Sequence, residues 1–329
     1  MKIGCLGAAR ITPPAIVNPS KVRPGAVLQS VAARDPERAR DFAQLHGFAR
    51  ADDSYDDLIN ARDIDLVYNA LPINLHAEWT IKALKAGKHV LCEKPFAMNS
   101  REVGEVQAIA RASGKRVIEA FHYRYHPSFP QLLAWIDSGE IGMITAVDAI
   151  FNVAIDVRDG TEIRHLPETG GGAFMDLGCY PVSWVLNVLR NRPVHIEAKA
   201  VLTPLGVDEK MEAVLTYPGA VRATVSASMA KGEGFAAQLK IKGSKGEIEF
   251  TNPLAPHYGA VLTLKSGIKV VTPRVSRVAT YVWQLDTVIY ALENQLAVPT
   301  EGDAVVMQQE VLDGVYAAAG LKHLRYRDS

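Results

Sequence analysis

Cysteine is scarce in this sequence, where Cys5, Cys92 and Cys179 are the three copies among 329 residues. Their number is odd and they lie far apart, which argues against a disulfide framework or a zinc site. Each lies among apolar residues, so we expect three buried free thiols. The histidines show no metal-ligand pattern either, and we therefore predict no bound metal.

The sequence also lacks net charge, with 36 basic and 36 acidic residues. It has no apolar run near the roughly 20 residues that a membrane helix needs. Neither nucleic acid nor a membrane surface is therefore an expected partner. The chain starts directly in a strand pattern instead of a charged and then apolar leader, which predicts a cytoplasmic protein.

What the sequence does have is length and apolar content, because 48% of its 329 residues are hydrophobic, and this predicts two domains. Strand and helix patterns alternate through about the first 120 residues, which predicts a doubly wound parallel sheet. Strands are expected at residues 2–6, 27–33, 65–70, 89–92 and 116–120, and helices at 36–46, 54–61, 75–86 and 100–113. Ligands of such sheets bind beyond the carboxyl ends of the strands.

The turn after the first strand reads Gly7-Ala8-Ala9-Arg10-Ile11. It is a degenerate version of the dinucleotide-binding pattern G-x-G-x-x-G, with Ala9 and Thr12 in place of the second and third glycines. Small residues let the backbone approach a pyrophosphate, and a following helix would offer its N-terminal amides. A tight turn without a ligand is the alternative at this point.

The end of the second strand bears on the choice of dinucleotide. Sites for NAD usually carry an acidic residue here, whereas this chain has Ala33 followed by Arg34, with Arg38 one helical turn on. A guanidinium can hold a 2′-phosphate that an acid would repel, and Arg10 could add a further positive charge. We therefore favour NADP(H) over NAD(H), although the neighbouring Asp35 leaves NAD open.

The apolar strand at residues 89–92 ends in Glu93-Lys94-Pro95. A lysine at a strand's carboxyl end, followed by a proline that cannot extend the strand, is placed over a cofactor. The alternative is a surface Glu-Lys pair before a turn.

Past residue 120 the pattern changes to strands joined by short turns, which predicts a mostly antiparallel sheet. We place the boundary between residues 1–121 and 122–329. Strands are expected at 144–153, 195–203, 211–217, 221–228, 238–242 and 247–250, and helices at 127–138, 281–296 and 303–324.

A further helix is expected after Gly170-Gly171-Gly172. Asp176 and Tyr180 are four residues apart on it and share one face, and Pro181 should kink it. An exposed aspartate and a core tyrosine are the alternative. The loop before the glycines offers four polar side chains for sugar hydroxyls: Asp156, Arg158, Arg164 and His165.

Several of these segments together resemble the Gfo/Idh/MocA oxidoreductases, the family of glucose–fructose oxidoreductase and inositol dehydrogenase. The matching residues are the turn 7–11, Leu71-Pro72 with His76, the run from Ala86-Gly87-Lys88-His89 to Glu93-Lys94-Pro95, and Glu119-Ala120-Phe121 with Arg124 and Pro127. One departure is Ile73, where members often carry Asn, and Asn74 is the candidate replacement.

The resemblance implies an α/β protein with a Rossmann domain and a C-terminal α+β domain with an open sheet. It also implies cofactor contacts from the turn 7–11, Leu71, His76, Glu93, Lys94 and Arg124. Members often form dimers or tetramers through the open sheet, so we expect a homo-oligomer. Tyr180 stands where many members have His, which resembles the branch with glucose–fructose oxidoreductase and dimeric dihydrodiol dehydrogenase.

The implied chemistry is hydride transfer at a C–OH/C=O centre, which requires a proton to move at the oxygen. We assign Tyr180 as the acid/base, Lys94 as its electrostatic partner and Asp176 as the orienting group. A nearby ammonium lowers the pKa of a phenol, which is otherwise near 10. Lys94 as the proton donor is the rival assignment. The predicted substrate is a sugar or polyol; the alternatives are a dihydrodiol dehydrogenase and a non-catalytic dinucleotide sensor.

Overall fold

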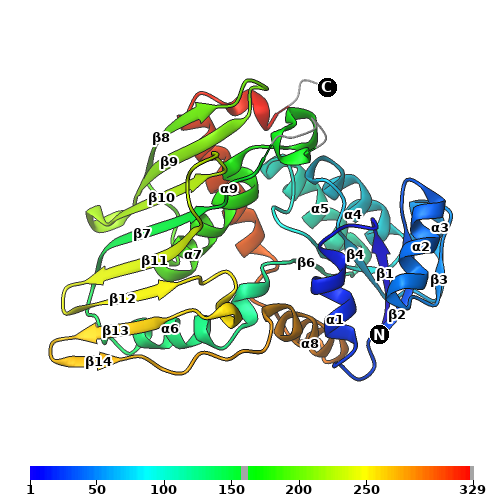
Figure 1. Ribbon diagram of the computed structural model, residues 1–329, viewed down its shortest axis with the longest axis horizontal. Coiled ribbons are helices and arrows are strands. Elements are labelled where there is room, and N and C mark those ends of the chain that lie inside the picture. Colours follow the sequence, from blue (N-terminus) through cyan, green and yellow to red (C-terminus); the bar gives the residue numbers. More distant parts are fainter. Residues whose placement is uncertain (157–161, 327–329) are drawn as a thin grey trace. The chain divides into compact units, whose positions relative to one another are not determined.

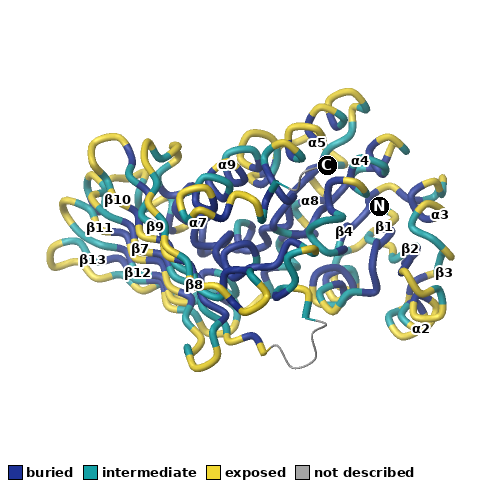
Figure 2. Tube along the Cα trace, turned by 90° about the horizontal axis from the view of Figure 1, so that it is seen from above, coloured by how far each residue is buried: buried dark blue, intermediate teal, exposed yellow. Residues whose placement is uncertain are grey.

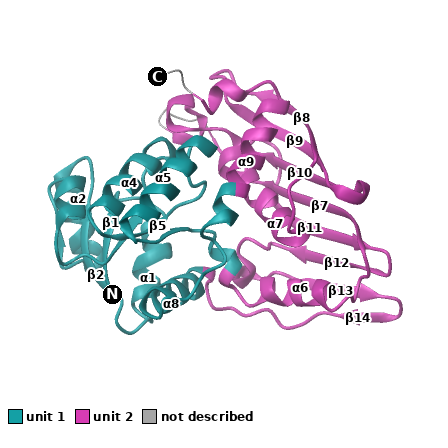
Figure 3. Cartoon of the chain, turned by 180° about the vertical axis from the view of Figure 1, so that it is seen from behind, with its two compact units in different colours: residues 1–124, 281–306 teal, residues 125–280, 307–329 magenta. Residues whose placement is uncertain are grey.

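The computed structural model describes residues 1–156 and 162–326. The chain forms two compact units, which Figure 3 colours separately. Unit 1 consists of Met1–Arg124 and Tyr281–Val306, and unit 2 of Tyr125–Thr280 and Met307–Ser329. The boundary expected at residue 121 assigns the segment 281–306 to the second domain, whereas in the structure this segment belongs to unit 1.

Unit 1 is built on a six-stranded parallel sheet with the order β3-β2-β1-β4-β5-β6. This order identifies a Rossmann sheet, with the reversal of strand order between β1 and β4. The five expected strands are present, and the additional β3 has only two residues, too few for an apolar pattern. The strands are β1 (Lys2–Leu6), β2 (Val27–Ala32), β3 (Arg50–Ala51), β4 (Leu66–Asn69), β5 (His89–Cys92) and β6 (Val117–Glu119).

Helices cover both faces of this sheet, with α4 and α5 on one side and α1 and α8 on the other (Figure 1). Arg23, just after α1, joins α8 through an ion pair with Asp286 at 2.7 Å. A five-residue π-helix, Pro13–Val17, leads into α1. The helices of unit 1 are α1 (Asn18–Ser20), α2 (Pro36–His46), α3 (Tyr55–Asn60), α4 (His76–Lys85), α5 (Ser100–Ser113) and α8 (Thr280–Glu293).

The ends of α2 show why the sequence pattern located this helix well. The Asp35 side chain accepts a hydrogen bond from the backbone N–H of Glu37 and caps the start. Gly47 ends the helix at φ 77°, a left-handed conformation that glycine adopts without strain.

Unit 2 contains an eight-stranded sheet with the order β14-β13-β12-β11-β7-β10-β9-β8. Its neighbours pair antiparallel except for the central β7 and β10, which are parallel, so the expected mostly antiparallel sheet is confirmed. The pattern missed β13 and β14. The strands are β7 (Ile144–Asn152), β8 (His195–Leu202), β9 (Asp208–Thr216), β10 (Arg222–Ser228), β11 (Ala236–Gly243), β12 (Gly246–Thr251), β13 (Leu262–Ser266) and β14 (Lys269–Val271).

The helices of unit 2 lie on one face of this sheet (Figures 1 and 3). They are α6 (Ser128–Asp137), α7 (Cys179–Leu189), which follows a π-helix at Phe174–Gly178, and α9 (Asp303–Ala318), whose first turn lies in unit 1. Alternate strand residues such as Ala223, Val225 and Ala227 are buried, and the ends of the hairpins are exposed (Figure 2).

All three cysteines are buried and free, as the sequence predicted. Among the described residues, no helix is both long and apolar enough to cross a membrane.

Candidate functional site

The turn after β1 brings the backbone close to the end of β4. Gly7 has φ +94°, and a Cβ added there would lie 3.3 Å from the carbonyl oxygen of Ala70, so a side chain is disfavoured on both counts. Ala9 and Ile11 form the turn that follows, since their carbonyl oxygens accept the N–H groups of Thr12 and Ala15. Arg10, between them, is exposed.

Arg34 and Arg38 lie where β2 passes into α2, and both are exposed. Arg38 donates to the carbonyl oxygen of Ala8 at 2.8 Å and thereby ties α2 to the glycine turn. Burial raises the pKa of the neighbouring Tyr55, and the positive charges of Arg34 and Arg38 oppose that rise. Asp35 caps α2 at 3.0 Å from the Glu37 N–H, so its carboxylate already has a structural partner.

The segment after β4 contains Leu71, Asn74 and His76. His76 is 1% exposed, and its Nε2 and Nδ1 lie 2.7 Å and 3.0 Å from the carbonyl oxygens of Leu71 and Pro95. Burial lowers the pKa of His76 to about 4, so the ring is neutral at pH 7 and donates to one of the two carbonyls. Asn74 has a buried Oδ1 with no hydrogen-bond partner among the described residues.

The turn at Glu93-Lys94-Pro95 is held by buried side chains from three strands or loops. Tyr68 of β4 donates to Glu93 Oε1 at 2.6 Å, His76 contacts Pro95, and Glu119 of β6 accepts the N–H of Phe96 at 3.1 Å. Glu119 is 2% exposed, and its burial raises the pKa of the carboxyl to about 8, which the Phe96 N–H opposes. The residues next to Lys94 at the end of β5 are therefore held in place by several hydrogen bonds.

Arg124 lies in a short 3₁₀ helix, His122–Tyr125, at the end of the first segment of unit 1. The His122 ring packs on Tyr281, the second residue of α8, with ring centroids 4.0 Å apart. Sequence reasoning did not select Tyr281, because it treated the segment 281–306 as part of the other domain. The motif at residues 119–127 gave no indication that His122 contacts a residue as far along the chain as Tyr281.

In unit 2 the π-helix and α7 carry Asp176 and Tyr180. Arg164 pairs with Glu162 at 2.7 Å and lies 3.7 Å from Asp176, so a cation faces that carboxylate. The bond from Arg164 lowers the pKa of Glu162. Pro181 has no N–H to donate to the carbonyl of Leu177, and the wide π turn ends one residue after Leu177.

Tyr180 is 5% exposed, and its ring lies near the rings of Phe151 and Trp184. Its ring meets Phe151 of β7 edge-on at 5.7 Å, and Phe151 meets Phe235 at 6.3 Å. Phe235 is 65% exposed, so the aromatic row runs from the buried phenol to the surface. Of the predicted loop contacts, Arg164 lies beside Asp176, His165 is buried with its Nε2 near the carbonyl of Ile155, and Arg158 is outside the described residues.

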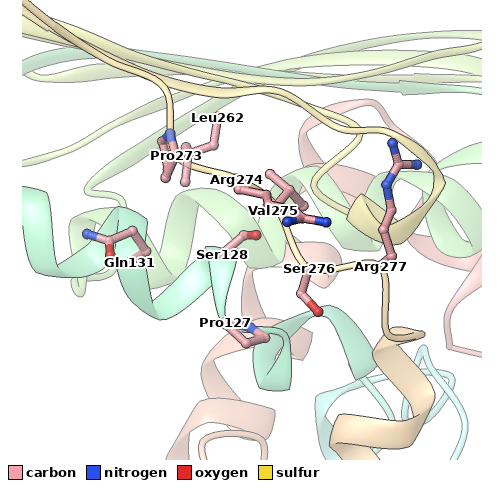
Figure 4. A pocket seen from close by; sticks show the side chains of 9 residues that line it. All are labelled: Pro127, Ser128, Gln131, Leu262, Pro273, Arg274, Val275, Ser276 and Arg277. Atoms are coloured by element: carbon pink, nitrogen blue, oxygen red, sulfur yellow. The ribbon is translucent and has the colours of Figure 1, made fainter.

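The structure thus places the predicted cofactor residues after the ends of the parallel strands of unit 1, and it places Asp176 and Tyr180 on the consecutive π-helix and α7 of unit 2. The predicted meeting of Lys94 with Asp176 and Tyr180 joins the two units and stays a prediction. A separate pocket of about 410 Å³ in unit 2, between α6, β13 and residues 273–277, contains none of these side chains (Figure 4). Within the described ranges, no three His, Cys, Asp or Glu side chains group as metal ligands would.

Comparison with known sequence families gives two matches. Residues 1–121 match the Gfo/Idh/MocA oxidoreductase family, NAD-binding Rossmann fold. Residues 129–249 match the Gfo/Idh/MocA C-terminal domain.

Individual relatives cover most of the chain. It is 36% identical to trans-1,2-dihydrobenzene-1,2-diol dehydrogenase of Xenopus tropicalis, over 68% of this chain and 67% of that one. It is 30% identical to D-xylose 1-dehydrogenase (NADP(+)) 2 of Haloferax volcanii, over 97% of both. A 3-ketoreductase of Actinomadura kijaniata, solved in complex with NADP and TDP-benzene, superposes with a TM-score of 0.87 at 24% identity over 97% of both chains, which shows a shared fold.

Proposed function

Because this chain belongs to the Gfo/Idh/MocA family of NAD(P)-binding oxidoreductases, we propose that it transfers hydride between NADP(H) and a sugar or polyol. The observation that carries the proposal is the arrangement around Lys94. The ammonium follows the strand end of β5, and buried bonds from Tyr68 and Glu119 fix its neighbours. Such pre-organisation is what a group acting on a cofactor and substrate requires.

The residues of unit 1 fit a dinucleotide. Gly7, with Ala8 and Ala9, leaves the backbone open for a pyrophosphate beside the helical turn at Pro13. Asn74 Oδ1 is buried without a partner among the described residues and is the orphaned acceptor that a ligand would satisfy. When bound, the nicotinamide supplies or accepts the hydride. We assign Leu71, His76, Glu93 and Arg124 to shaping the surrounding strand-end surface, with His76 acting through backbone carbonyls.

The preference for NADP(H) rests on Arg34. Arg38 already donates to Ala8, and Asp35 is occupied as the cap of α2. Arg34 has no carboxylate within ion-pair distance among the described residues, so its guanidinium is available for a 2′-phosphate.

The proton transfer is assigned to Tyr180. Its phenol would give or take the proton at the substrate oxygen, and the Lys94 ammonium would stabilise the phenolate. Asp176, held near Arg164, would accept a hydrogen bond from a substrate hydroxyl and fix the orientation of the substrate.

A second candidate substrate class is a cyclic diol. The exposed ring of Phe235, which contacts Phe151 and through it Tyr180, would stack against an apolar ring, whereas a fully hydroxylated sugar gains less from such a contact. The relative from Xenopus tropicalis is a trans-1,2-dihydrobenzene-1,2-diol dehydrogenase.

The test is NADPH oxidation, or NADP⁺ reduction, measured by absorbance against aldoses, keto-sugars, polyols and cyclic diols. We expect turnover on one class and a loss of roughly 10²-fold or more in kcat for Tyr180→Phe, with NADPH affinity unchanged. Tyr217→Phe is the matched control, because Tyr217 is also a buried tyrosine of unit 2 and lies outside the proposed site. Near-normal kcat in Tyr180→Phe would remove Tyr180 from the mechanism, and tight NADPH binding without any turnover would favour a sensor.

A further inference from the structure

We propose that Asp208 is a positioning residue for the reaction, because its buried carboxylate fixes the start of the helix that carries Asp176 and Tyr180. The inference rests on the proposed function of those two side chains. Asp208 is far from them in the sequence and belongs to no motif identified from it.

Asp208 is the first residue of β9 and is 0% exposed. Its Oδ2 accepts the backbone N–H of Phe174, the first residue of the π-helix, at 2.6 Å. Its Oδ1 accepts the hydroxyl of Tyr316, on α9, at 2.7 Å. One carboxylate therefore joins a strand of the sheet, the start of the π-helix that leads into α7, and α9.

The N–H groups of a first helical turn have no partner within the helix. For Phe174 that partner is a charged acceptor, and charge-assisted hydrogen bonds are about twice as strong as neutral ones. Asp176 is two residues further along, and its own N–H donates to the carbonyl oxygen of Gly172 at 3.1 Å. The place where the helix starts thus determines where the Asp176 and Tyr180 side chains lie.

The glycine run explains how the carboxylate comes this close. Gly172 has φ +126°, and a Cβ there would lie 2.2 Å from Asp208 Oδ1 and 2.8 Å from the Tyr316 hydroxyl. Any side chain at position 172 would displace the carboxylate. The sequence indicated the three glycines only as the residues before a helix, and in the structure the missing side chain of Gly172 leaves the space for the Asp208 carboxylate.

The C-terminal segment completes the surroundings of the carboxylate. The Arg325 guanidinium lies 4.6 Å from the centroid of the Tyr316 ring and donates to the carbonyl oxygen of Gly171 at 3.4 Å. Burial raises the pKa of Asp208 to about 6, and the bonds from Tyr316 and Phe174, with the charge of Arg325, oppose the rise. At pH 8 the group is ionised and its bonds are charge-assisted.

The experiment compares Asp208→Ala and Asp208→Asn with the wild type at pH 8. The alanine variant removes the acceptor, and we expect kcat to fall by roughly 10-fold or more, since small displacements of reacting groups are costly. The asparagine variant can still accept a hydrogen bond from the Phe174 N–H through its side-chain oxygen and donate one to the Tyr316 hydroxyl through its amide. Its kcat should therefore lie between those of the wild type and the alanine variant. NADPH affinity, set by unit 1, should be unchanged in both, and NADPH-binding stoichiometry counts the folded molecules.

A residue that only stabilises the fold would lower the melting temperature while each folded molecule kept the wild-type kcat, and that result would overturn the proposal. If Asp208→Ala does not fold, the Asp208→Asn variant decides the question. A kcat at least about 2-fold below that of the wild type, with the same NADPH affinity, supports the positioning role. A kcat equal to that of the wild type contradicts it. Tyr180→Phe separates this outcome from failure of the proposed function. An inactive Tyr180→Phe beside a fully active Asp208→Asn would reject the positioning role alone.

Discussion

At the scale of single residues, the three charged side chains after β2 have different roles. Asp35 caps α2, Arg38 holds the glycine turn through Ala8, and Arg34 is exposed beside Tyr55. The sequence predicted the two arginines as phosphate ligands and kept Asp35 as a possible ribose ligand. Only the side-chain contacts show which of the three already has a structural partner.

Arg34→Ala should weaken NADPH binding by about 10- to 100-fold and NADH binding by much less, because a charge-assisted bond to a phosphate contributes about 1.5–3 kcal/mol. Fluorescence titration of both cofactors measures the two dissociation constants. Arg40→Ala is the control, since Arg40 lies on the same helix but pairs with Glu37 and Asp53. Equal losses for NADPH and NADH would disprove the phosphate role of Arg34.

The same titration of Asp35→Ala tests the NAD alternative. As a helix cap, Asp35 should contribute about 1 kcal/mol to stability and leave the cofactor preference unchanged. A selective loss of NADH affinity would instead identify it as a ribose ligand.

At the scale of elements, the turn between β5 and α5 depends on the two strands that flank β5. Glu119 of β6 holds the Phe96 N–H, and Tyr68 of β4 holds Glu93, so strands on both sides of β5 fix the position after Cys92. The sequence located these strands but gave no indication that Glu119 points into the interior. The buried carboxyl carries a cost in stability that depends on pH.

Burial raises the pKa of Glu119 from 4.5 to about 8, so the folded state binds its proton more tightly than the unfolded state. Its stabilising contribution is complete below pH 4.5 and is lost as the pH rises through 8. Glu119→Gln keeps an acceptor for Phe96 without titrating. The free energy of unfolding in urea should therefore fall less between pH 5.5 and 8.5 in this variant than in the wild type, by on the order of 1–3 kcal/mol.

Asp208 also has a raised pKa, and it adds the same pH dependence to the free energy of unfolding of the wild type and of Glu119→Gln. The difference between the two pH profiles therefore reports on Glu119. Glu105→Gln, an exposed position on α5, serves as the control. Identical pH profiles for wild type and Glu119→Gln would show that the carboxyl does not titrate in this interval.

At the scale of the whole molecule, the sheet of unit 2 has one face covered by its own helices. The alternating apolar residues of β10 belong to this internal core, because Ala223, Val225 and Ala227 are buried. The opposite face carries cross-strand ion pairs such as Lys240–Glu249 at 3.1 Å and Lys265–Glu247 at 2.8 Å. The expected homo-oligomer, if it forms through this face, would have a polar interface.

Thr224 lies on that outward face, beside Asp148 of β7 and Val214 of β9. Thr224→Glu would place a second acid next to Asp148 and should dissociate the oligomer, as measured by light scattering, while NADPH still binds to unit 1. Lys231→Glu, in a loop outside the strands, should leave the mass unchanged. An unaltered mass for Thr224→Glu would exclude this face as the interface.

The sequence by itself determined the alternation of elements in unit 1, the ends of α2 and α5, the change to a mostly antiparallel sheet, and the family. Apolar periodicity, caps and the Glu93-Lys94-Pro95 run are local patterns, and local backbone preferences decide them. Only the tertiary structure decided the parallel pairing of β7 with β10, the place of α8 in unit 1, and the contacts of Asp208 and Glu119. These depend on which distant segments become neighbours in a sheet or core, and no spacing along the chain encodes that choice.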